Sequence, residues 1–310
     1  MGNHQSLESV KEAAKEAHEQ AKTLARALPY LRRYTGDTIV IKYGGHAMVD
    51  NYLSNDFGHD IALLKQVGIN PIIVHGGGPQ INQMLKRMEI ESNFIDGLRI
   101  TSEAIIDVIE MVLAGTVNKQ VATLINQAGA LAVGISGKDG GLIEAHKLVK
   151  HVWDETLKCE KTIDLGLVGE PVHIDPRVLY ALSGSGLIPV VAPIGTDKQG
   201  QTYNINADIA AGSIAGAVRA SRLFMLTDVP GVLDKDGNLI SELTEEEAKE
   251  AIASGIITGG MIPKIETCLE AVKAGAQAAV IMDGRVPHAC LLELFTEGGS
   301  GTLIRSGKVL

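Results

Sequence analysis

The sequence predicts an α/β protein with a mostly parallel central sheet that helices cover on both faces. Short apolar, β-branched runs alternate with amphipathic or alanine-rich segments through 38–304, as in strand–helix units. Four predicted strands lead directly into glycine-bearing turns, at 44–45, 76–78, 137–141 and 227–231. Because the carboxyl ends of parallel strands share one edge, these turns should converge where open α/β sheets bind ligands.

The composition favours a cytoplasmic enzyme. The 310 residues are 45% hydrophobic, include 35 glycines and carry a formal net charge of −9. A negative charge disfavours a general nucleic-acid or anionic-membrane surface, and no uninterrupted apolar run is long enough to predict a membrane span. Cys159, Cys268 and Cys290 lack metal-ligand spacing, so we expect reduced thiols. We therefore expect a cytoplasmic protein with no membrane and no nucleic-acid partner.

The N-terminal segment carries a heptad seam ahead of the first strand. Apolar residues recur at alternating spacings of three and four from Leu7 to Leu31, which is typical of about three coiled-coil repeats. Pro29 is expected to kink or end the helix near Leu28. Residues 1–35 are assigned to this helix. It can reach a neighbouring subunit, since it belongs to no strand–helix unit, or lie on its own domain.

A strand, three glycines and a proline-led helix follow one another in the first third of the chain. Ile72–His75 leads into Gly76, Gly77 and Gly78, and Pro79 opens an amphipathic segment, as at the first turn of a helix. Glycines let the backbone approach a ligand, and the N–H groups of a helix start favour an anion. A tight turn that binds nothing is the alternative. The other glycine junctions favour the anion site.

The remaining elements alternate in the same way. Apolar runs bounded by glycine or proline predict strands, and Ser, Thr, Asn or Asp before an amphipathic stretch predicts a helix start. Strands are expected at 38–42, 71–75, 130–136, 142–148, 163–174, 187–193, 223–226, 278–282 and 301–304. Helices are expected at 55–67, 81–88, 103–114, 117–128 and 287–295, with four more that open at 175–176, 203–208, 244–247 and 258–264. The pair 142–148 and 163–174 should be short and mostly antiparallel, with bends at Gly166 and Gly169.

A lysine ends the first predicted strand. Lys42 stands beside Gly44 and Gly45, where phosphate binding is its natural role, because lysine is rarely buried without a partner. The alternative is a lysine that extends from the sheet into solvent.

Further polar residues open two later helices. Asn204, Asn206 and Asp208 exceed what helix capping needs, so a ligand role is favoured. Lys264 lies beside a second glycine turn, and Arg99 follows a turn. Two lysines, an arginine and a carboxylate suit phosphoryl transfer, which needs positioned reactants, positive charge on the transferring group and a carboxylate that organises the site.

The motifs of several common enzyme classes do not occur in the sequence. There is no G-x-x-x-x-G-K-[ST] segment, and Gly76–Gly78 does not continue as G-x-G-x-x-G because Ile81 takes the last position. No G-x-S-x-G elbow or metalloprotease helix occurs either. The sequence therefore disfavours a dinucleotide oxidoreductase and a P-loop NTPase.

In this set and order the motifs resemble the amino acid kinase family. Each motif alone is moderately specific, the ordered set is strongly so, and the resemblance covers nearly all of 38–304. It is carried by Lys42 with Gly44–Gly45, His75–Pro79, Gly97–Arg99, Asn204–Asp208, Thr227–Gly231 and Gly259–Lys264. Within the family the set most resembles the members that phosphorylate N-acetyl-L-glutamate in arginine biosynthesis.

The resemblance implies an open, three-layer αβα sandwich with two lobes. Residues 36–220 would bind the amino-acid substrate, and residues 221–310 would bind ATP with its Mg²⁺. The γ-phosphoryl group would pass to the side-chain carboxylate of N-acetyl-L-glutamate and yield an acyl phosphate and ADP. Mg²⁺ would come with the nucleotide and keep several waters, so no protein ligand of the metal is expected.

The resemblance also implies roles for single residues. Lys42 and Lys264 would stabilise the transferring phosphoryl group as compact, mobile charges. Asp208 would hold both lysines as an organiser, since a carboxylate nucleophile needs no general base. Gly44 and Gly45 would donate N–H groups to phosphate. The substrate would contact Gly76, Gly77, Arg99 and Asn204, with Arg99 on its α-carboxylate. The nucleotide would contact Thr227, Asp228, Gly259 and Gly260.

The N-terminal heptads resemble the additional helix of arginine-inhibited members, which interlaces dimers into a hexamer, a trimer of dimers. Those members share a segment like His288–Ile304, and by that likeness Glu293 and Gly299 would contact L-arginine. Val280 departs from the pattern, because some inhibited members carry histidine there. We expect a homo-hexamer that arginine inhibits.

Three alternatives remain open at this stage. Kinases of the same family act on glutamate, aspartate, carbamate or nucleoside monophosphates, but aspartate kinases and many glutamate 5-kinases carry appended domains. A non-catalytic sensor on the same fold should lack Lys42, Asp208 or Lys264, and all three are present. A phosphate-binding isomerase would not explain lysines on two lobes.

Overall fold

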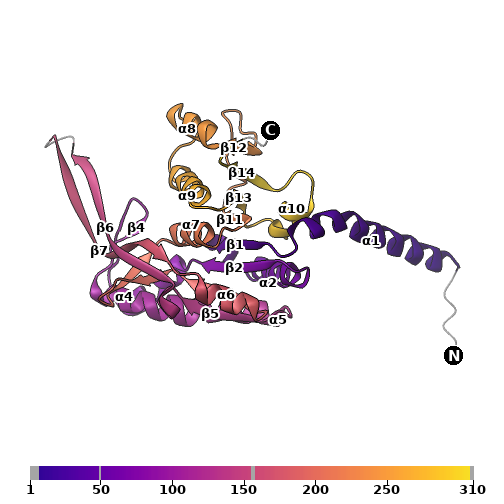
Figure 1. The fold of residues 1–310 in the computed structure, drawn as a ribbon, viewed down its shortest axis with the longest axis horizontal. Helices are drawn as coiled ribbons and strands as arrows, with labels where there is room; N and C mark the ends of the chain where they lie inside the picture. Colours follow the sequence, from indigo (N-terminus) through magenta and orange to yellow (C-terminus); the bar gives the residue numbers. More distant parts are fainter. Residues whose placement is uncertain (1–6, 49, 155–157, 308–310) are drawn as a thin grey trace.

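One eight-stranded sheet forms the centre of the structure. The computed structural model describes residues 7–48, 50–154 and 158–307. The strand order is β12 (Glu242–Thr244), β14 (Gly301–Arg305), β13 (Ala279–Asp283), β11 (Arg222–Thr227), β1 (Thr38–Tyr43), β2 (Asn70–His75), β8 (Ile188–Ala192) and β5 (Ala132–Ser136). Every neighbouring pair is parallel except β13 and β14. The predicted, mostly parallel sheet is confirmed (Figure 1).

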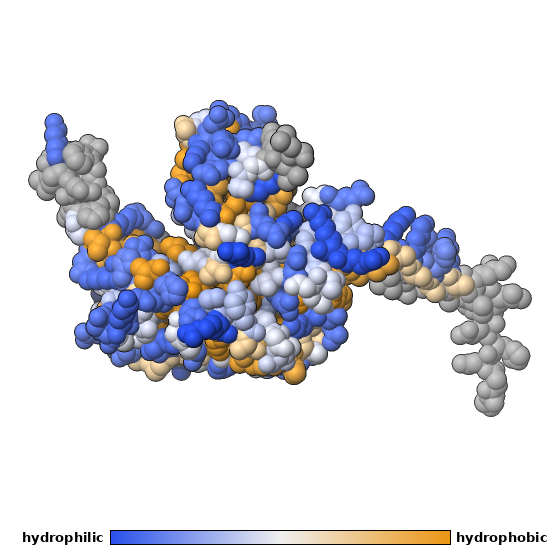
Figure 2. Space-filling view, viewed as in Figure 1, coloured by the Kyte–Doolittle hydropathy of each residue, from blue (hydrophilic) through white to orange (hydrophobic). Residues whose placement is uncertain are grey.

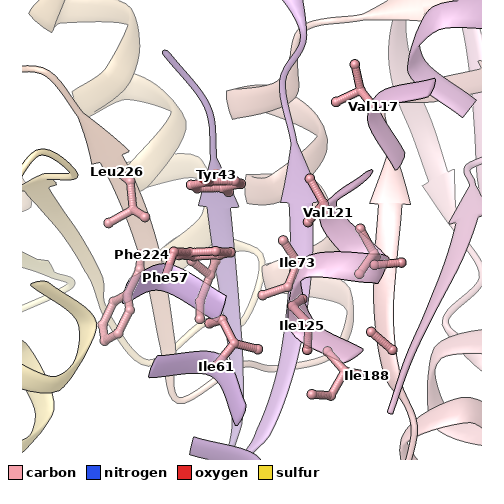
Figure 3. Close-up of a cluster of buried hydrophobic side chains, with 14 of the residues drawn as sticks. Tyr43, Phe57, Ile61, Ile73, Val117, Val121, Ile125, Ile188, Phe224 and Leu226 are labelled. Carbon is pink, nitrogen blue, oxygen red and sulfur yellow. The ribbon is translucent and has the colours of Figure 1, made fainter. Parts of the chain in front are cut away.

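Helices cover both faces of the sheet. Along β1, Ile39 and Ile41 belong to one buried cluster and Val40 to the other, because successive residues of a strand point to opposite faces. Figure 3 shows part of the first cluster, where the Tyr43 ring stacks on Phe57 with centroids 3.8 Å apart. The first cluster includes α2 (Asn51–Gln66), α3 (Gly78–Arg87), α5 (Asn118–Gln127) and α10 (Ala289–Phe295). The second includes α6 (Arg177–Gly184), α7 (Ala207–Ala217), α8 (Glu245–Ala253) and α9 (Met261–Lys273). The three-layer arrangement is confirmed.

The structure describes the side chains of two of the three cysteines, for which the sequence predicts reduced thiols. Cys268 lies in the second cluster and Cys290 in the first, and both are buried free thiols. The side chain of Cys159 lies outside the described part of the chain.

A small closed barrel stands beside the main sheet. It joins β10 (Thr202–Ile205), β7 (Cys159–Ile174), β6 (Ile143–Asp154) and β9 (Ile194–Thr196). The antiparallel β6–β7 pair is confirmed, but the prediction of short strands was wrong. The added residues pair with one another away from the main sheet (Figure 1), so no core-facing alternation marks them in the sequence. Gly166 takes a φ of 72°, and a Cβ there would lie 2.1 Å from the Thr101 carbonyl oxygen.

The N-terminal helix α1 (Leu7–Tyr34) projects from the body of the protein (Figure 1). Of the two predicted effects of Pro29, a kink or an end of the helix, the end was wrong. The helix continues for five residues beyond Pro29 to Tyr34, which is 7% exposed and lies in the first core cluster. Burial of Tyr34 offsets the one backbone hydrogen bond that a proline removes. Ala14, Ala17 and Ala21 of the seam are exposed. The side chains of Leu7, Val10 and Leu24 lie outside the described part.

A single long helix replaces the two predicted at 103–114 and 117–128. It consists of α4 (Glu103–Glu110), the π-helical segment η2 (Met111–Val117) and α5. Its length and composition would suffice to cross a membrane, but half of it is buried. Apolar side chains such as Ile109, Val112 and Ile125 lie in the first core cluster, which identifies it as a core helix.

Helix starts follow their predicted caps with small differences. Thr244 and Glu247 form a capping box at the start of α8, where the sequence predicts that a helix opens. Asp50 caps α2, which begins four residues before the predicted start, whereas Ser102 precedes α4 without a side-chain cap bond. The sequence did not predict β9, β12 or the hairpin of β3 (Phe94–Ile95) and β4 (Leu98–Arg99), nor the 3₁₀ turns η1 (Gly45–Met48) and η3 (Asp139–Gly141).

Candidate active site

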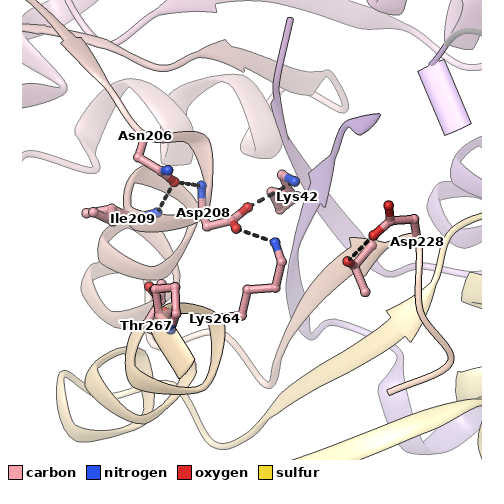
Figure 4. A network of polar contacts seen from close by, with 9 residues as sticks. Lys42, Asn206, Asp208, Ile209, Asp228, Lys264 and Thr267 are labelled. Atoms are coloured by element: carbon pink, nitrogen blue, oxygen red, sulfur yellow. Dashed lines mark hydrogen bonds and ion pairs between the residues drawn. The ribbon is translucent and has the colours of Figure 1, made fainter. Parts of the chain in front are cut away.

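A carboxylate held by two lysines lies at the carboxyl edge of the main sheet. Asp208 is in the first turn of α7, Lys42 near the end of β1 and Lys264 in the first turn of α9. Lys42 Nζ lies 2.9 Å from Asp208 Oδ1, and Lys264 Nζ lies 2.7 Å from Asp208 Oδ2. Figure 4 shows each carboxylate oxygen facing a different lysine. Three residues from distant parts of the chain therefore form one cluster.

The attraction of the lysines outweighs the burial of this carboxylate. The side chains of Asp208 and Lys42 are only 16% and 12% exposed, and that of Lys264 is 24% exposed. Burial by itself raises the pKa of Asp208, but the two ammonium groups hold it at about 2. The carboxylate is thus ionised at neutral pH. Two cations and one anion leave the cluster with a net positive charge.

Glycine backbone surrounds Lys42. A Cβ at Gly44 would lie 3.1 Å from Lys42 Nζ and 3.7 Å from Gly76 Cα, so a side chain there would displace the lysine. Gly45 takes a φ of 69°, a conformation that favours glycine. The Gly76 N–H donates to the Tyr43 carbonyl at 2.8 Å, which ties the two turns together. The arrangement places glycine backbone without side chains next to the Lys42 ammonium group, as a phosphate site requires.

A cavity of 190 Å³ opens beside these turns. Its wall combines glycine backbone, apolar side chains, two amides and a guanidinium, from Gly76, Gly77, Gly78, Ile81, Phe94, Gly97, Leu98, Arg99, Leu113, Val168, Pro193, Asn204, Ile205, Asn206 and Ala207. All four residues assigned to the substrate by resemblance line it. The cavity suits a small ligand with an apolar part and a charged end.

Arg99 brings a buried positive charge to this cavity. The residue is 5% exposed, and its guanidinium donates to Ser92 Oγ at 2.5 Å and to Asn82 Oδ1 at 2.6 Å. The guanidinium carbon lies 4.5 Å from the centre of the Phe94 ring. Burial lowers the pKa of Arg99, and no ion pair to a carboxylate is found for it among the described residues. An anionic ligand would supply the counter-charge.

A larger cavity of 680 Å³ adjoins the first, and the two share Gly97, Leu98 and Asn206 in their walls. Figure 2 shows the surface hollowed between the barrel and the side formed by α8 and α9. The other residues that line the 680 Å³ cavity are Asp96, Lys150, Asp208, Ile209, Gly259, Gly260, Pro263, Lys264 and Thr267. Its volume is that of a typical cofactor site, and the glycine backbone at 259–260 with the Lys264 ammonium fits the phosphates of a nucleotide.

Two residues assigned to the nucleotide lie elsewhere. Thr227 ends β11, and its hydroxyl donates to Asp228 Oδ1 at 3.3 Å. Neither residue lines the 680 Å³ cavity, and Figure 4 places Asp228 well apart from Asp208. Among the described residues, no group of three or more His, Cys, Asp or Glu side chains could hold a metal ion.

Four residues around the site were not anticipated from the sequence. Asn82 and Ser92 hold Arg99, and Lys150 lines the large cavity and forms an ion pair with Asp96 at 2.5 Å. The Asn118 amide donates to the Val190 carbonyl of β8 at 2.8 Å. No local motif marks any of them. A buried asparagine within a helical pattern is the one available signal, at Asn118, because an amide is rarely buried without a structural partner.

The histidine before the glycine turn is fully buried. His75 Nδ1 lies 2.7 Å from the Gly76 carbonyl oxygen and Nε2 lies 3.1 Å from Asn118 Nδ2. Burial lowers the pKa of His75 from 6.5 to about 4; the hydrogen bond to Gly76 opposes this shift, and the nearby Lys119 ammonium adds to it. The imidazole is therefore neutral at physiological pH.

This depressed pKa predicts an acid-sensitive stability. Below pH 6.5 the unfolded chain protonates His75 while the folded chain does not, so the contribution of the neutral imidazole is lost as the pH falls from 6.5 to about 4. The loss amounts to roughly 3 kcal/mol. We expect urea unfolding of wild type to show this loss relative to His75→Asn, which lacks the titrating group. A difference between the two proteins that stays constant from pH 7 to pH 4.5 would contradict the assignment.

A third cavity, of 550 Å³, lies where α1 meets the C-terminal segment. Tyr30, Arg33, Tyr34, Arg222, Ser241, Glu242, Glu293, Leu294, Thr296, Glu297, Gly298, Gly299, Gly301 and Leu303 line it. Glu293 Oε2 accepts a hydrogen bond from the Ser300 N–H at 2.7 Å, and burial raises the pKa of Glu293. A Cβ at Gly299 would lie 2.7 Å from Glu293 Oε2, so only glycine leaves this carboxylate room.

The chain is similar to a family profile, to curated proteins and to a solved structure. The profile of the amino acid kinase family matches residues 37–283. An acetylglutamate kinase of Gluconacetobacter diazotrophicus is 74% identical over 290 residues, 94% of this chain and 92% of that protein. One of Gluconobacter oxydans is 68% identical over 94% of this chain and 99% of that protein. The crystal structure of N-acetylglutamate synthase from Neisseria gonorrhoeae with coenzyme A and N-acetyl-glutamate has a TM-score of 0.78 at 24% identity, covering 93% of this chain and 64% of that one.

Proposed function

The chain belongs to the amino acid kinase family, and from this premise we propose that it transfers the γ-phosphoryl group of ATP to the side-chain carboxylate of N-acetyl-L-glutamate. One observation carries the proposal. The Asp208 carboxylate holds two lysines beside both cavities, of which the smaller contains a buried arginine and the larger a glycine turn. The relatives called acetylglutamate kinases support this choice of substrate.

The geometry suits an in-line transfer between the two cavities. A carboxylate oxygen of the substrate attacks the γ-phosphorus, a new C–O–P linkage forms, and the bond to the ADP oxygen breaks. ATP with its Mg²⁺ supplies the phosphoryl group and part of the charge neutralisation. Lys42 and Lys264 offset charge on the transferring group. Asp208 fixes both ammonium groups and takes no proton, because the attacking carboxylate has none to lose.

The binding roles that we propose combine the walls of the two cavities with the resemblance to the family. Arg99 would pair with the α-carboxylate of the substrate, and Gly76 and Gly77 would face its reacting end. Gly44 and Gly45 would donate N–H groups to phosphate. The nucleotide would extend from Gly259 and Gly260 toward Thr227 and Asp228. We place the amino-acid lobe at 36–220 and the ATP lobe at 221–310.

The experiment is to trap acyl phosphate with hydroxylamine. The purified protein receives MgATP with N-acetyl-L-glutamate, L-glutamate, L-aspartate or carbamate in parallel. We expect hydroxamate only with N-acetyl-L-glutamate. Product with another acceptor would assign the chain to glutamate 5-kinase, aspartate kinase or carbamate kinase chemistry. No product from a folded protein with any acceptor would favour a sensor on the same fold.

We further propose that L-arginine inhibits the enzyme from the 550 Å³ cavity. Three glutamates line that cavity, Glu242, Glu293 and Glu297, and they suit a ligand with a guanidinium and an ammonium group. Glu242 already pairs with the Arg305 guanidinium. Glu293 accepts from the neutral Ser300 N–H, and no ion pair of Glu293 or Glu297 is found among the described residues, so these two carboxylates suit a cationic ligand. Because Tyr30 and Tyr34 of α1 line the same cavity, the ligand would contact the helix that carries the heptad seam.

The helix α1 gives a direct test of assembly. Its exposed alanines, including Ala17, leave the seam uncovered within one chain, and we propose that it packs against α1 of a second copy to build a hexamer from three dimers. Deletion of 1–31 is expected to yield dimers with a weaker response to arginine, measured by sedimentation and by the ratio of rates with and without arginine. Ala17→Glu should act like the deletion, because a charge enters the seam. His18→Glu, outside the seam and exposed, is the matched control. Unchanged large particles after deletion would exclude this role.

A further inference from the structure

The buried histidine before the glycine turn has a definite tautomer. Its Nε2 faces the amide nitrogen of Asn118 at 3.1 Å, and an amide nitrogen only donates. The same amide nitrogen lies 3.1 Å from the Ile135 carbonyl and 2.8 Å from the Val190 carbonyl, while Asn118 Oδ1 accepts from Lys119 Nζ at 3.0 Å. These contacts fix the orientation of the amide. The two carbonyl oxygens match the two N–H bonds of this amide, so the tautomer of His75 follows from its other ring nitrogen. The Gly76 carbonyl oxygen, 2.7 Å from Nδ1, can only accept, which places the proton on Nδ1 and leaves Nε2 unprotonated beside the amide.

The protonated Nδ1 holds the next peptide group. His75 Nδ1 lies 2.7 Å from the Gly76 carbonyl oxygen, so it donates to that oxygen. The Gly76 carbonyl and the Gly77 N–H belong to one planar trans peptide and point in opposite directions. Anchoring the carbonyl on the buried side turns the Gly77 N–H the other way. Both glycines line the 190 Å³ cavity, and no backbone hydrogen bond from the Gly77 N–H is found among the described residues.

The π-helical segment packs closely against Gly77. A Cβ at Gly77 would lie 2.5 Å from Leu113 Cδ2 and 3.5 Å from Val117 Cγ2, so the helix touches the Gly77 backbone. The segment Met111–Val117 ends directly before Asn118, and π-helical turns are often associated with functional sites. The helix therefore supplies both the contact that confines Gly77 and the amide that faces the unprotonated Nε2 of His75.

We infer that His75 is a positioning residue for phosphoryl transfer: through the Gly76 carbonyl it aims the Gly77 N–H at the reacting end of the substrate. This inference rests on the proposed kinase function. The N–H is a fixed dipole beside the atoms on which charge changes during transfer, so it acts mainly on the transition state. His75 itself does not touch the substrate.

Two substitutions separate this role from simple packing. Asparagine places its amide nitrogen near the position of imidazole Nδ1, whereas glutamine places its amide near Nε2. His75→Asn can still donate to the Gly76 carbonyl, and His75→Gln cannot. We expect His75→Gln to lower kcat about 100-fold with little change in the KM for ATP, and His75→Asn to stay within about 10-fold of wild type. Equal losses in both variants, or a rise in KM alone, would overturn the inference.

A spectroscopic measurement tests the tautomer directly in the wild-type protein. In wild-type protein with ¹⁵N-labelled histidine, the two-bond ¹⁵N–¹H spectrum distinguishes a protonated Nδ1 from a protonated Nε2, and the signal that His75→Asn lacks identifies His75. We expect a neutral ring with the proton on Nδ1. A proton on Nε2 would overturn the inference. Wild-type hydroxamate formation reports separately on the proposed function, so failure of one is distinguishable from failure of the other.

Discussion

Lys42→Ala and Lys264→Ala are each expected to lower kcat by about 1,000-fold or more while the protein remains folded. Each lysine is a positive charge fixed by Asp208, at 2.9 Å and 2.7 Å, and such charges act on the transferring phosphoryl group, where a single fixed cation contributes a factor of about 10³–10⁵. A methyl group restores none of this charge. The measurement is hydroxamate formation with saturating N-acetyl-L-glutamate and MgATP.

The control for the lysine variants is a lysine with a similar ion pair far from the cavities. Lys249 pairs with Glu245 at 2.6 Å on α8 and its side chain is 64% exposed, so Lys249→Ala should leave kcat unchanged. Circular dichroism and thermal unfolding establish that each variant is folded. Normal turnover in a folded Lys42→Ala or Lys264→Ala would remove these lysines from the reaction. Similar losses in all three variants would indicate an effect of net charge.

Asp208→Asn is expected to lower kcat about 100-fold without raising the KM for ATP. The neutral amide no longer attracts the two ammonium groups, which then repel one another and lose their fixed positions. The net charge of the cluster rises by one, so an anionic nucleotide still binds at least as well. Steady-state kinetics that separate kcat from KM are the measurement, because an organiser acts on the former.

Asp236→Asn is the matched control for this charge change, since Asp236 lies in an exposed turn. A large rise in the KM for ATP with normal kcat would show that Asp208 binds the nucleotide instead of organising the lysines. A pH profile adds a second check. The two lysines hold the pKa of Asp208 at about 2, so its ionisation should not limit activity on the acid side above pH 4.

The strands and glycine turns could be predicted because their signals are local. Ile39, Val40 and Ile41 form a continuous β-branched run, which is typical of a strand buried on both faces, and all three are fully buried. The capping box at Thr244 depends on two residues three positions apart. The π-helical segment could not be predicted, because its widened turns depend on contacts with strands elsewhere in the chain. The continuation of α1 past Pro29 likewise depends on burial of Tyr34 against the body of the protein.

By itself, the sequence determined the layered α/β fold and the residue types at the ends of its strands, since periodicity, glycine turns and caps act between near neighbours. Only the tertiary structure decided which groups meet. Asp208 reaches Lys264 across 56 residues of sequence, the Arg99 guanidinium donates to the neutral side chains of Asn82 and Ser92, and the Asn118 amide faces Nε2 of His75 from 43 residues away. These pairings follow from packing two faces of one sheet, and the energy of a buried charge depends on its neighbours in space.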